Sequence, residues 1–278
     1  MGNLIKMDLI RARKDVLLKV MLIVGAAFAL TTPLLYSLML GDMDAETMMV
    51  MEAMGVNQFH AKTQFFASFS LSNNCGLVAT ILTAILLCRD FSYGTIRNKI
   101  ICGHSRTSIF ISMYIMCAVV MWLVMLAQAL LTLGISLLFF DYQAGAFTMT
   151  DFGYLMASLG FELLDYLFIA ALITMLCAVF KKAGLAIVLY MAVMFLFSLV
   201  GVILSVVILV MGFEPGNGDS VAVLEFFQRI NIFQSNAMIG TGSGYDLEDV
   251  AYYVLPPVLF TAGLLSFGAW RFNQKDLK

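Results

Sequence analysis

Six stretches of the chain are almost entirely apolar, and the short segments between them hold most of the charged residues. The apolar stretches cover residues 16–40, 65–88, 109–140, 153–180, 183–213 and 250–270. A helix needs about 20 apolar residues to cross the hydrocarbon of a bilayer, and each stretch reaches that length. The pattern predicts an all-α integral membrane protein in which six transmembrane helices form one domain over residues 1–278.

The composition places the chain in lipid rather than in water. Of its 278 residues, 62% are hydrophobic and only 12% are charged, and the mean hydropathy is +0.94. One water-soluble core cannot hide so much apolar surface, so the lipid bilayer is an expected partner. The formal net charge of −2 gives no basic patch of the kind that binds phosphate backbones, and we expect no nucleic-acid partner.

Basic residues alternate with the apolar stretches and predict the orientation. All but Lys62 and Arg229 gather in the N-terminal tail, the second loop, the fourth loop and the C-terminal tail. These residues are Lys6, Arg11, Arg13, Lys14, Lys19, Arg89, Arg97, Lys99, Arg106, Lys181, Lys182, Arg271, Lys275 and Lys278. Positively charged loops stay on the cytoplasmic side. Both termini are therefore predicted in the cytoplasm, and residues 214–249 form a predicted extracellular segment.

The N-terminal tail combines apolar and basic residues with helical spacing. Ile5, Leu9, Ala12 and Val16 fall on one stripe of a helix, and basic residues lie elsewhere around it. This pattern is typical of a helix that lies in the inner membrane interface. A frayed polar tail is the alternative.

The second loop, residues 89–112, has a pattern that a simple connector does not need. Gly94 and Gly103 bracket a stretch in which Thr95 could cap a short helix. Within it, Ile96, Ile100 and Ile101 supply an apolar side, and Arg97 and Lys99 supply charge. Residues 94–103 are therefore predicted to form an amphipathic cytoplasmic helix that docks a soluble partner. Ordinary positive-inside anchoring is the alternative, although it explains neither the glycines nor the isoleucines.

This loop resembles that of the permease subunits of ATP-binding-cassette exporters of the second (ABC-two) class, particularly small bacterial ones. The resemblance rests on Asp90, Gly94, Thr95, Ile96, Arg97, Gly103, Ser105 and Arg106. It extends over the whole chain through the N-terminal tail, the six stretches and the long segment before the last one. Asp90 stands where many relatives have Glu. The resemblance implies a coupling helix that docks on an ATPase through Asp90, Gly94, Thr95, Ile96, Arg97, Lys99, Ile100, Gly103 and Arg106.

The resemblance also implies partners and a location. Two ATPase subunits and two permease chains, identical or related, would assemble in a bacterial cell membrane. The sequence contains no Gly-Lys pair and therefore no Walker A loop. ATP and Mg²⁺ are accordingly expected on the partner ATPase, with no cofactor and no enzymatic reaction on this chain. Relatives export peptides, drugs, lipids or ions, and an amphipathic or antimicrobial peptide is one possible substrate.

Polar residues inside the apolar stretches are candidates for a substrate path. Glu162 and Asp165, three residues apart, share one face of the fourth predicted span. Acids at membrane depth usually face the interior of the bundle, and the pair is a hypothetical site for a cationic or amphipathic substrate. Alternatively, the two acids contact water near the outer surface or pair with a neighbouring helix. Asn73, Asn74 and Gln128 either line the path or bond between helices.

Two other classes of function remain as alternatives. A membrane enzyme would need clustered catalytic groups, but His60 and His104 are predicted on opposite sides of the membrane. An ion or secondary transporter would favour broken helices in two related halves, and the sequence shows no internal repeat. No metal site is predicted: the methionines of residues 43–54 favour an interfacial helix over a copper site. The five cysteines are predicted as small buried hydrophobes.

Overall fold

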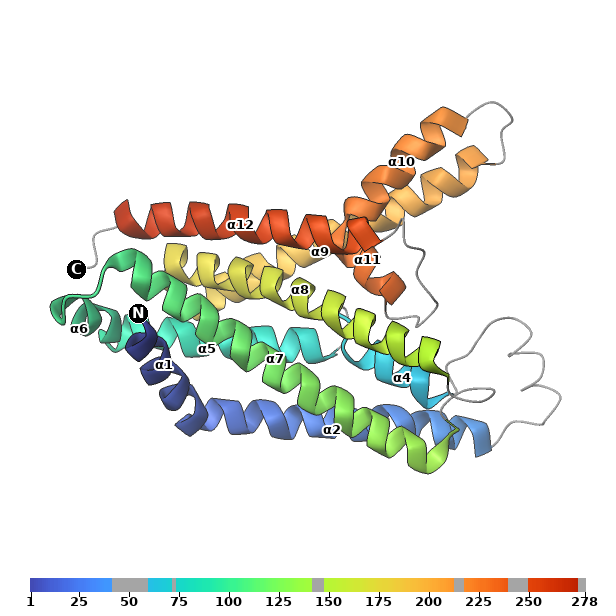
Figure 1. Cartoon of the computed structure of the whole chain (residues 1–278), viewed down its shortest axis with the longest axis horizontal. Helices are drawn as coiled ribbons and strands as arrows, with labels where there is room; N and C mark the ends of the chain where they lie inside the picture. The colour runs from blue at the N-terminus through green and yellow to red at the C-terminus, as the bar shows by residue number, and fades with distance from the viewer. Residues whose placement is uncertain (42–59, 72–73, 142–147, 213–217, 240–249, 275–278) are drawn as a thin grey trace.

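The structure is a computed structural model that describes residues 1–41, 60–71, 74–141, 148–212, 218–239 and 250–274 (Figure 1). Within these ranges the regular elements are α-helices, and no strand occurs among them, which confirms the all-α class. The helices are α1 (Gly2–Lys14), α2 (Val16–Gly41), α4 (Ala61–Ser68), α5 (Asn74–Ser92), α6 (Thr95–Ile101), α7 (Arg106–Phe139), α8 (Met149–Phe180), α9 (Ala183–Gly212), α10 (Gly218–Ile230), α11 (Ile232–Ile239) and α12 (Val250–Gln274).

Five of these helices are long and apolar enough to cross a membrane, namely α2, α7, α8, α9 and α12. Each corresponds to a predicted span, and its ends agree with the prediction to within four residues. Helices α5 and α6 meet at 56° and reach the required length and hydropathy only as a pair. Five candidate spans are therefore present in the described part of the chain, or six if this bent pair counts as one.

The second predicted span is wrong as a single helix over residues 65–88. The chain instead forms α4 and α5, with a break between them. The amide of Asn236, on α11, holds the break: its Oδ1 accepts hydrogen bonds from the Ser70 hydroxyl at 2.9 Å and from the Leu71 N–H at 2.8 Å. A Cβ on Gly76 would lie 2.5 Å from the Leu71 carbonyl oxygen, so only glycine permits this close approach.

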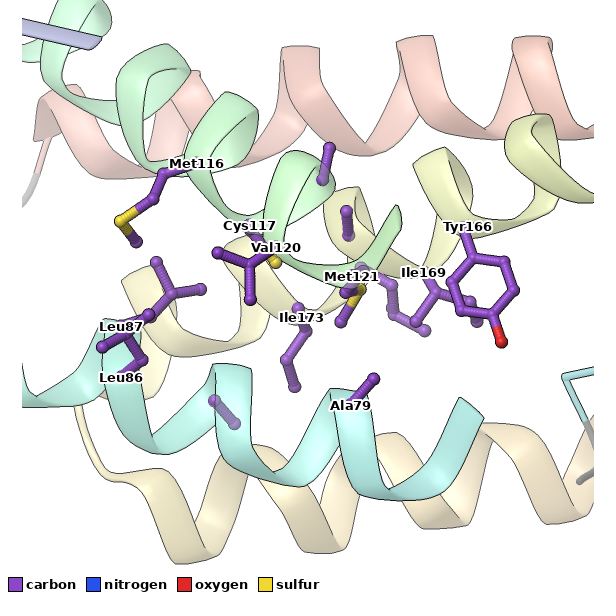
Figure 2. Packing of buried hydrophobic residues seen from close by; sticks show 14 of the residues in the cluster. Ala79, Leu86, Leu87, Met116, Cys117, Val120, Met121, Tyr166, Ile169 and Ile173 are labelled. Atoms are coloured by element: carbon purple, nitrogen blue, oxygen red, sulfur yellow. The ribbon is translucent and has the colours of Figure 1, made fainter. Parts of the chain in front are cut away.

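A buried apolar core lies between α5, α7 and α8 (Figure 2). Its labelled side chains are Ala79, Leu86 and Leu87 from α5, Met116, Cys117, Val120 and Met121 from α7, and Tyr166, Ile169 and Ile173 from α8. All of these side chains are buried, as expected where helices interdigitate at high packing density. Helices α7 and α8 therefore form the centre of the bundle.

Helix α12 packs against this centre at a glycine. A Cβ on Gly268 would lie 2.6 Å from Cζ of Phe110, on α7. The ring of Phe110 therefore occupies the space that a larger residue would need, and it also contacts Phe272 at a centroid separation of 5.9 Å. Near the end of α12, Arg106 donates a hydrogen bond to the Asn273 carbonyl at 2.9 Å. The last helix is thus fixed to the start of α7.

The outer helices expose apolar surface. In the most apolar stretch of α9, 6% of the residues are buried, against 67% in that of α8. Many large side chains of α2, α9 and α12 are exposed as well. A water-soluble protein rarely shows contiguous apolar patches of this size, so these faces match a lipid environment.

The cysteine prediction is partly confirmed. Cys88, Cys117 and Cys177 are buried and free. Cys102 is exposed, so the prediction is wrong there: it follows the last residue of α6, at the edge of the bundle. The side chain of Cys75 lies outside the described part of the structure.

The N-terminus, α6 and the end of α12 lie at the same end of the bundle (Figure 1). We call this the terminal end. The helices α10 and α11 lie toward the opposite end (Figure 1). Two sites of polar chemistry follow this division, one at each end.

Candidate functional site

Helix α6 is set between two glycines, as the sequence predicted. Gly94 has φ +67° and Gly103 has φ +85°, backbone conformations that other residues adopt only with strain. Gly94 occupies the N-cap position without a side-chain cap. The predicted capping by Thr95 is therefore wrong, because Thr95 is already the first residue of the helix.

The two faces of α6 differ in burial. Ile96 and Lys99 are buried, and Ile100 packs against the core. On the opposite face, Arg97 is exposed and Ile101 is 74% exposed. The three isoleucines predicted to share one apolar side are divided between the two faces, because the helical spacing of 96, 99 and 100 turns Ile101 outward.

Just before α6, Tyr93 is also 71% exposed. Together with Arg97 and Ile101 it presents one aromatic, one cationic and one aliphatic side chain at the terminal end. We call these three residues the α6 outer face. Exposed aromatic and arginine side chains of this kind are enriched at protein interfaces.

Lys99 forms a buried ion pair with the N-terminal helix. Its Nζ lies 2.7 Å from Oδ1 and 2.9 Å from Oδ2 of Asp8, on α1. The Ser112 hydroxyl donates a further hydrogen bond to Asp8 Oδ2 at 2.7 Å. Asp8 and Lys99 are 1% and 3% exposed, so water screens this pair little.

Two further charges complete the group. Arg11 Nη2 lies 2.5 Å from Asp90 Oδ2 and 3.9 Å from Asp8 Oδ1. Lys99 Nζ lies 4.0 Å from Asp90 Oδ2. These four residues form the α1–α6 charge cluster, in which two acids balance two bases. The balance offsets the cost of taking the charges out of water.

A second ion pair lies beside the cluster. Arg89 Nη1 lies 3.0 Å from Oδ2 of Asp15, and Oδ1 of Asp15 accepts a hydrogen bond from the Leu17 N–H at 3.0 Å. Asp15 thus links the end of α5 to the turn between α1 and α2. The N-terminal helix is therefore attached to the elements around α6 at its middle, through Asp8, and at its C-terminal end, through Asp15.

The structure divides the predicted docking residues into two groups. Asp90 and Lys99 point into the charge cluster, and Arg106 donates to a backbone carbonyl of α12. Arg97 alone of the predicted charged docking residues is exposed on α6. A docking role for this segment stays a prediction. In it, Arg97 would be the charged residue of α6 that contacts the partner.

Sequence reasoning missed Asp8 and Arg11. The predicted helix of the tail is confirmed as α1, which contradicts a frayed tail. Its buried residues are Leu4, Asp8 and Ala12, however. The buried side of the helix is therefore offset from the apolar stripe that the sequence predicted, and the two share only Ala12. The available signal was that Asp8 and Asp15 are the only acids among residues 1–41, in a tail otherwise rich in bases.

The second polar site surrounds Asn236 on α11. Its Nδ2 donates to Glu162 Oε2 at 2.7 Å and to Asp165 Oδ2 at 2.9 Å, both on α8. Because Oδ1 accepts from Ser70 and Leu71, the amide uses both of its donor hydrogens and both acceptor positions. We call these five residues the Asn236 hub. It joins α8, α11 and the break between α4 and α5.

The hub contains two acidic residues and no basic residue. Glu162 and Asp165 are 0% and 1% exposed, so the predicted alternative of wetting at the outer surface is wrong. They instead pair with a neighbouring helix, α11. Within the described ranges neither forms an ion pair, and Glu162 Oε1 has no hydrogen-bond partner. Outside those ranges the only basic residues are Lys275 and Lys278, at the C-terminus.

The other predicted path residues are not brought to the hub. Gln128 is buried on α7 and faces α2, where its Oε1 lies 3.4 Å from a Cβ built on Gly25. Asn73 lies outside the described residues, and so does the side chain of Asn74. The methionines of residues 43–54 also lie outside them. In the described ranges no group of three His, Cys, Asp or Glu side chains could hold a metal ion.

The fold defines a multi-pass membrane protein of several long apolar helices. Its residues 44–278 match a family described as "Protein of unknown function (DUF2705)", and the chain belongs to this family. A comparison with curated proteins found no match.

Proposed function

We propose that this chain is the membrane permease subunit of an ATP-driven exporter of the ABC-two class. Two copies, or this chain and a related one, would pair with two ATPase subunits that carry ATP and Mg²⁺. The observation that carries the proposal is α6, a short helix bracketed by two positive-φ glycines and bent by 56° from α5. Its outer face is exposed while its inner face is bonded to the rest of the chain.

The α6 outer face has the chemistry of a docking site. Tyr93 and Ile101 lose unfavourable contact with water when a partner covers them, and Arg97 adds a charged contact at the edge. In a cell this end would face the cytoplasm, where the ATPase is found. The partner is therefore expected to offer an apolar groove with an acid at its rim.

The α1–α6 charge cluster provides a route by which a displacement of α6 would be transmitted to the neighbouring helices. Lys99 and Asp90 bind α1, and Ser112 of α7 binds the same Asp8. Helix α1 is thus bonded to α5, α6 and α7, so a displacement of α6 would be carried through α1 to the other two helices. Closure of the ATPase pair on nucleotide would then shift the permease between inward-open and outward-open states.

The double variant Arg97→Glu/Ile101→Asp is expected to lose the ATPase. Both side chains are exposed, so the substitutions remove docking chemistry without disturbing the core. Co-purification of tagged permease with an ATP-binding-cassette ATPase encoded beside it should fall at least tenfold, because a few central contacts carry most interface energy.

The matched control for this experiment is Lys182→Glu, which reverses an exposed cation in a different predicted cytoplasmic loop. It should retain the ATPase at the level of the unaltered chain. Equal recovery of the ATPase by the double variant would remove α6 as the docking segment and the exporter proposal with it.

The Asn236 hub favours a second candidate, a cation-driven secondary transporter. Two buried carboxylates without a cation from the described chain attract positive charge from elsewhere. Acids inside a membrane commonly mark ion pathways. In this case transport would run without any ATPase.

The variant Glu162→Gln/Asp165→Asn discriminates between the two candidates. Both substitutions keep side-chain size and remove the charge. For a cation-driven carrier, vesicles that contain the purified chain alone should take up protons or Na⁺ under an imposed potential, and this variant should lose most of that uptake. The exposed Asp141→Asn is the control. Absence of uptake by the unaltered chain would eliminate this candidate.

A further inference from the structure

The outward side of α1 carries bases and no acid. The buried residues of α1 are Leu4, Asp8 and Ala12, and their spacing of four places them on one side of the helix. The opposite side is exposed and consists of Asn3, Lys6, Met7, Ile10, Arg13 and Lys14. We call these six residues the α1 basic face. It is separate from both the α1–α6 charge cluster and the α6 outer face.

The fold separates the charges of the N-terminal segment. Asp8 and Asp15 are the only acids among residues 1–41, and both pair with bases of α6 or α5. Of the five bases in the same range, Arg11 turns toward these acids. The other four are exposed and form no hydrogen bond or ion pair within the described part of the chain; they are Lys6, Arg13, Lys14 and Lys19. Four positive charges therefore point away from the bundle.

Apolar side chains lie among the bases of α1. Met7 and Ile10 are 48% and 47% exposed. Together with Asn3 and Lys6 they line an open hollow of about 340 Å³. Bases interleaved with exposed apolar side chains on one helix face are typical of helices that lie against a membrane surface. The hollow thus combines apolar contact with a positive charge.

The α1 basic face continues into the apolar outer surface of α2. The two helices are separated by a single residue, and both lie on the outside of the bundle (Figure 1). Val16 and Ile23 of α2 are 67% and 68% exposed, as expected for side chains that face acyl chains. Lys19 lies between them on the same side of α2, and a lysine at such a depth extends its ammonium group to the headgroups. The bases therefore lie where acyl chains meet phosphates.

We propose that the α1 basic face binds anionic phospholipids of the membrane surface. The phosphate groups lie against Lys6, Arg13 and Lys14 with charge-assisted contacts, and the acyl chains lie against Met7, Ile10 and the start of α2. Each base beside an anionic membrane surface strengthens binding about fivefold. Lipid bound here holds α1 from the side opposite the charge cluster. The inference uses neither the exporter proposal nor the cation-driven alternative.

Lipid binding to the whole purified chain, without any ATPase, tests the proposal. The chain is delipidated in a neutral maltoside detergent and titrated with dioleoyl phosphatidylglycerol or dioleoyl phosphatidylethanolamine, and bound lipid is counted by native mass spectrometry. The two lipids share acyl chains and phosphate but differ in net charge. The unaltered chain should bind the anionic lipid at least about tenfold more tightly. Added salt should reduce this preference, because exposed charges are screened.

The variant Lys6→Gln/Arg13→Gln/Lys14→Gln removes the three charges of the α1 basic face. Its preference for the anionic lipid should fall to about twofold or less. Glutamine is as good a helix former as lysine or arginine, and all three side chains are exposed, so the helix is retained. An unfolding temperature close to that of the unaltered chain would show that the variant is folded.

Two further variants serve as controls. Arg97→Gln/Lys182→Gln/Arg271→Gln removes three exposed bases from other elements and should keep the preference for the anionic lipid. Met7→Ser/Ile10→Ser removes apolar contact from the α1 basic face. It should weaken the binding of both lipids by a similar factor and leave their ratio unchanged.

Four outcomes would overturn the proposal. Equal affinity of the unaltered chain for the two lipids would leave the bases to an acidic protein partner instead. An unchanged preference in the α1 triple variant, or an equal loss in the control triple variant, would remove the α1 basic face as the site. Binding of soluble glycerol phosphate as tightly as the lipid would assign the face to a free anion. None of these outcomes depends on whether α6 recruits an ATPase.

Discussion

The variant Lys99→Met is expected to lose about 3 to 5 kcal/mol of folding stability, which is the usual cost of removing one partner of a buried ion pair. Asp8 is 1% exposed and would keep only Ser112 and the more distant Arg11. The cluster would then hold two acids against one base. Thermal unfolding of the purified chain in detergent measures the loss, and a fall of several degrees is expected.

The matched control on the same helix is Arg97→Met, which removes an exposed cation of similar length. Its effect should stay within about 0.5 kcal/mol. The double variant Asp8→Leu/Lys99→Met removes the pair as a unit and should recover most of the stability, since apolar replacements of buried pairs are often neutral or better. Similar unfolding temperatures for Lys99→Met and Arg97→Met would show that the cluster does not hold α6 to α1.

Long apolar stretches were the part of the fold that could be predicted. A helix that crosses the bilayer needs a minimum number of apolar residues, whatever its neighbours are. The composition of α7, α8, α9 or α12 alone was therefore enough to predict that helix. The end of a helix can depend on local contacts too. Helix α8 begins at Met149, four residues before the predicted span, because Thr148 and Asp151 form a capping box.

The break between α4 and α5 could not be predicted from residues 65–88, which are apolar on both sides of it. It depends on Asn236, 166 residues beyond Ser70 in the chain. The burial of Asp8 likewise depends on a residue far away in the sequence, because its partner Lys99 is 91 residues away. From hydropathy alone, an acidic residue is expected to be exposed to water. Asp8 is buried because a base from a distant part of the sequence pairs with it.

The candidate site at α6 was predicted in part. The glycines marked both ends of the helix because positive φ is a local requirement that few other residues meet. Which face of a seven-residue helix is buried depends on what lies behind it. The charges of Arg97 and Lys99 looked equivalent in the sequence, but α1 covers only Lys99.

The variant Asn236→Leu is expected to have the largest effect at the opposite end of the bundle. It removes two hydrogen bonds to buried carboxylates and two to the break between α4 and α5. Leaving a buried donor or acceptor without its partner costs about 1 to 3 kcal/mol. We expect a loss of about 4 kcal/mol, measured as a lower unfolding temperature and a lower yield of monodisperse protein.

A neighbouring residue supplies the control for Asn236→Leu. Ser235 is also buried on α11, but its hydroxyl bonds only to the Ile232 carbonyl of the same helix, at 3.0 Å. Ser235→Ala should therefore cost about 1 kcal/mol or less. Removing the acids together with the amide, as Glu162→Gln/Asp165→Leu/Asn236→Leu, should recover part of the loss, because the unpaired carboxyl groups are removed with their donor. Equal stability of Asn236→Leu and Ser235→Ala would mean that the hub contributes nothing to holding α8, α11 and the α4–α5 break together.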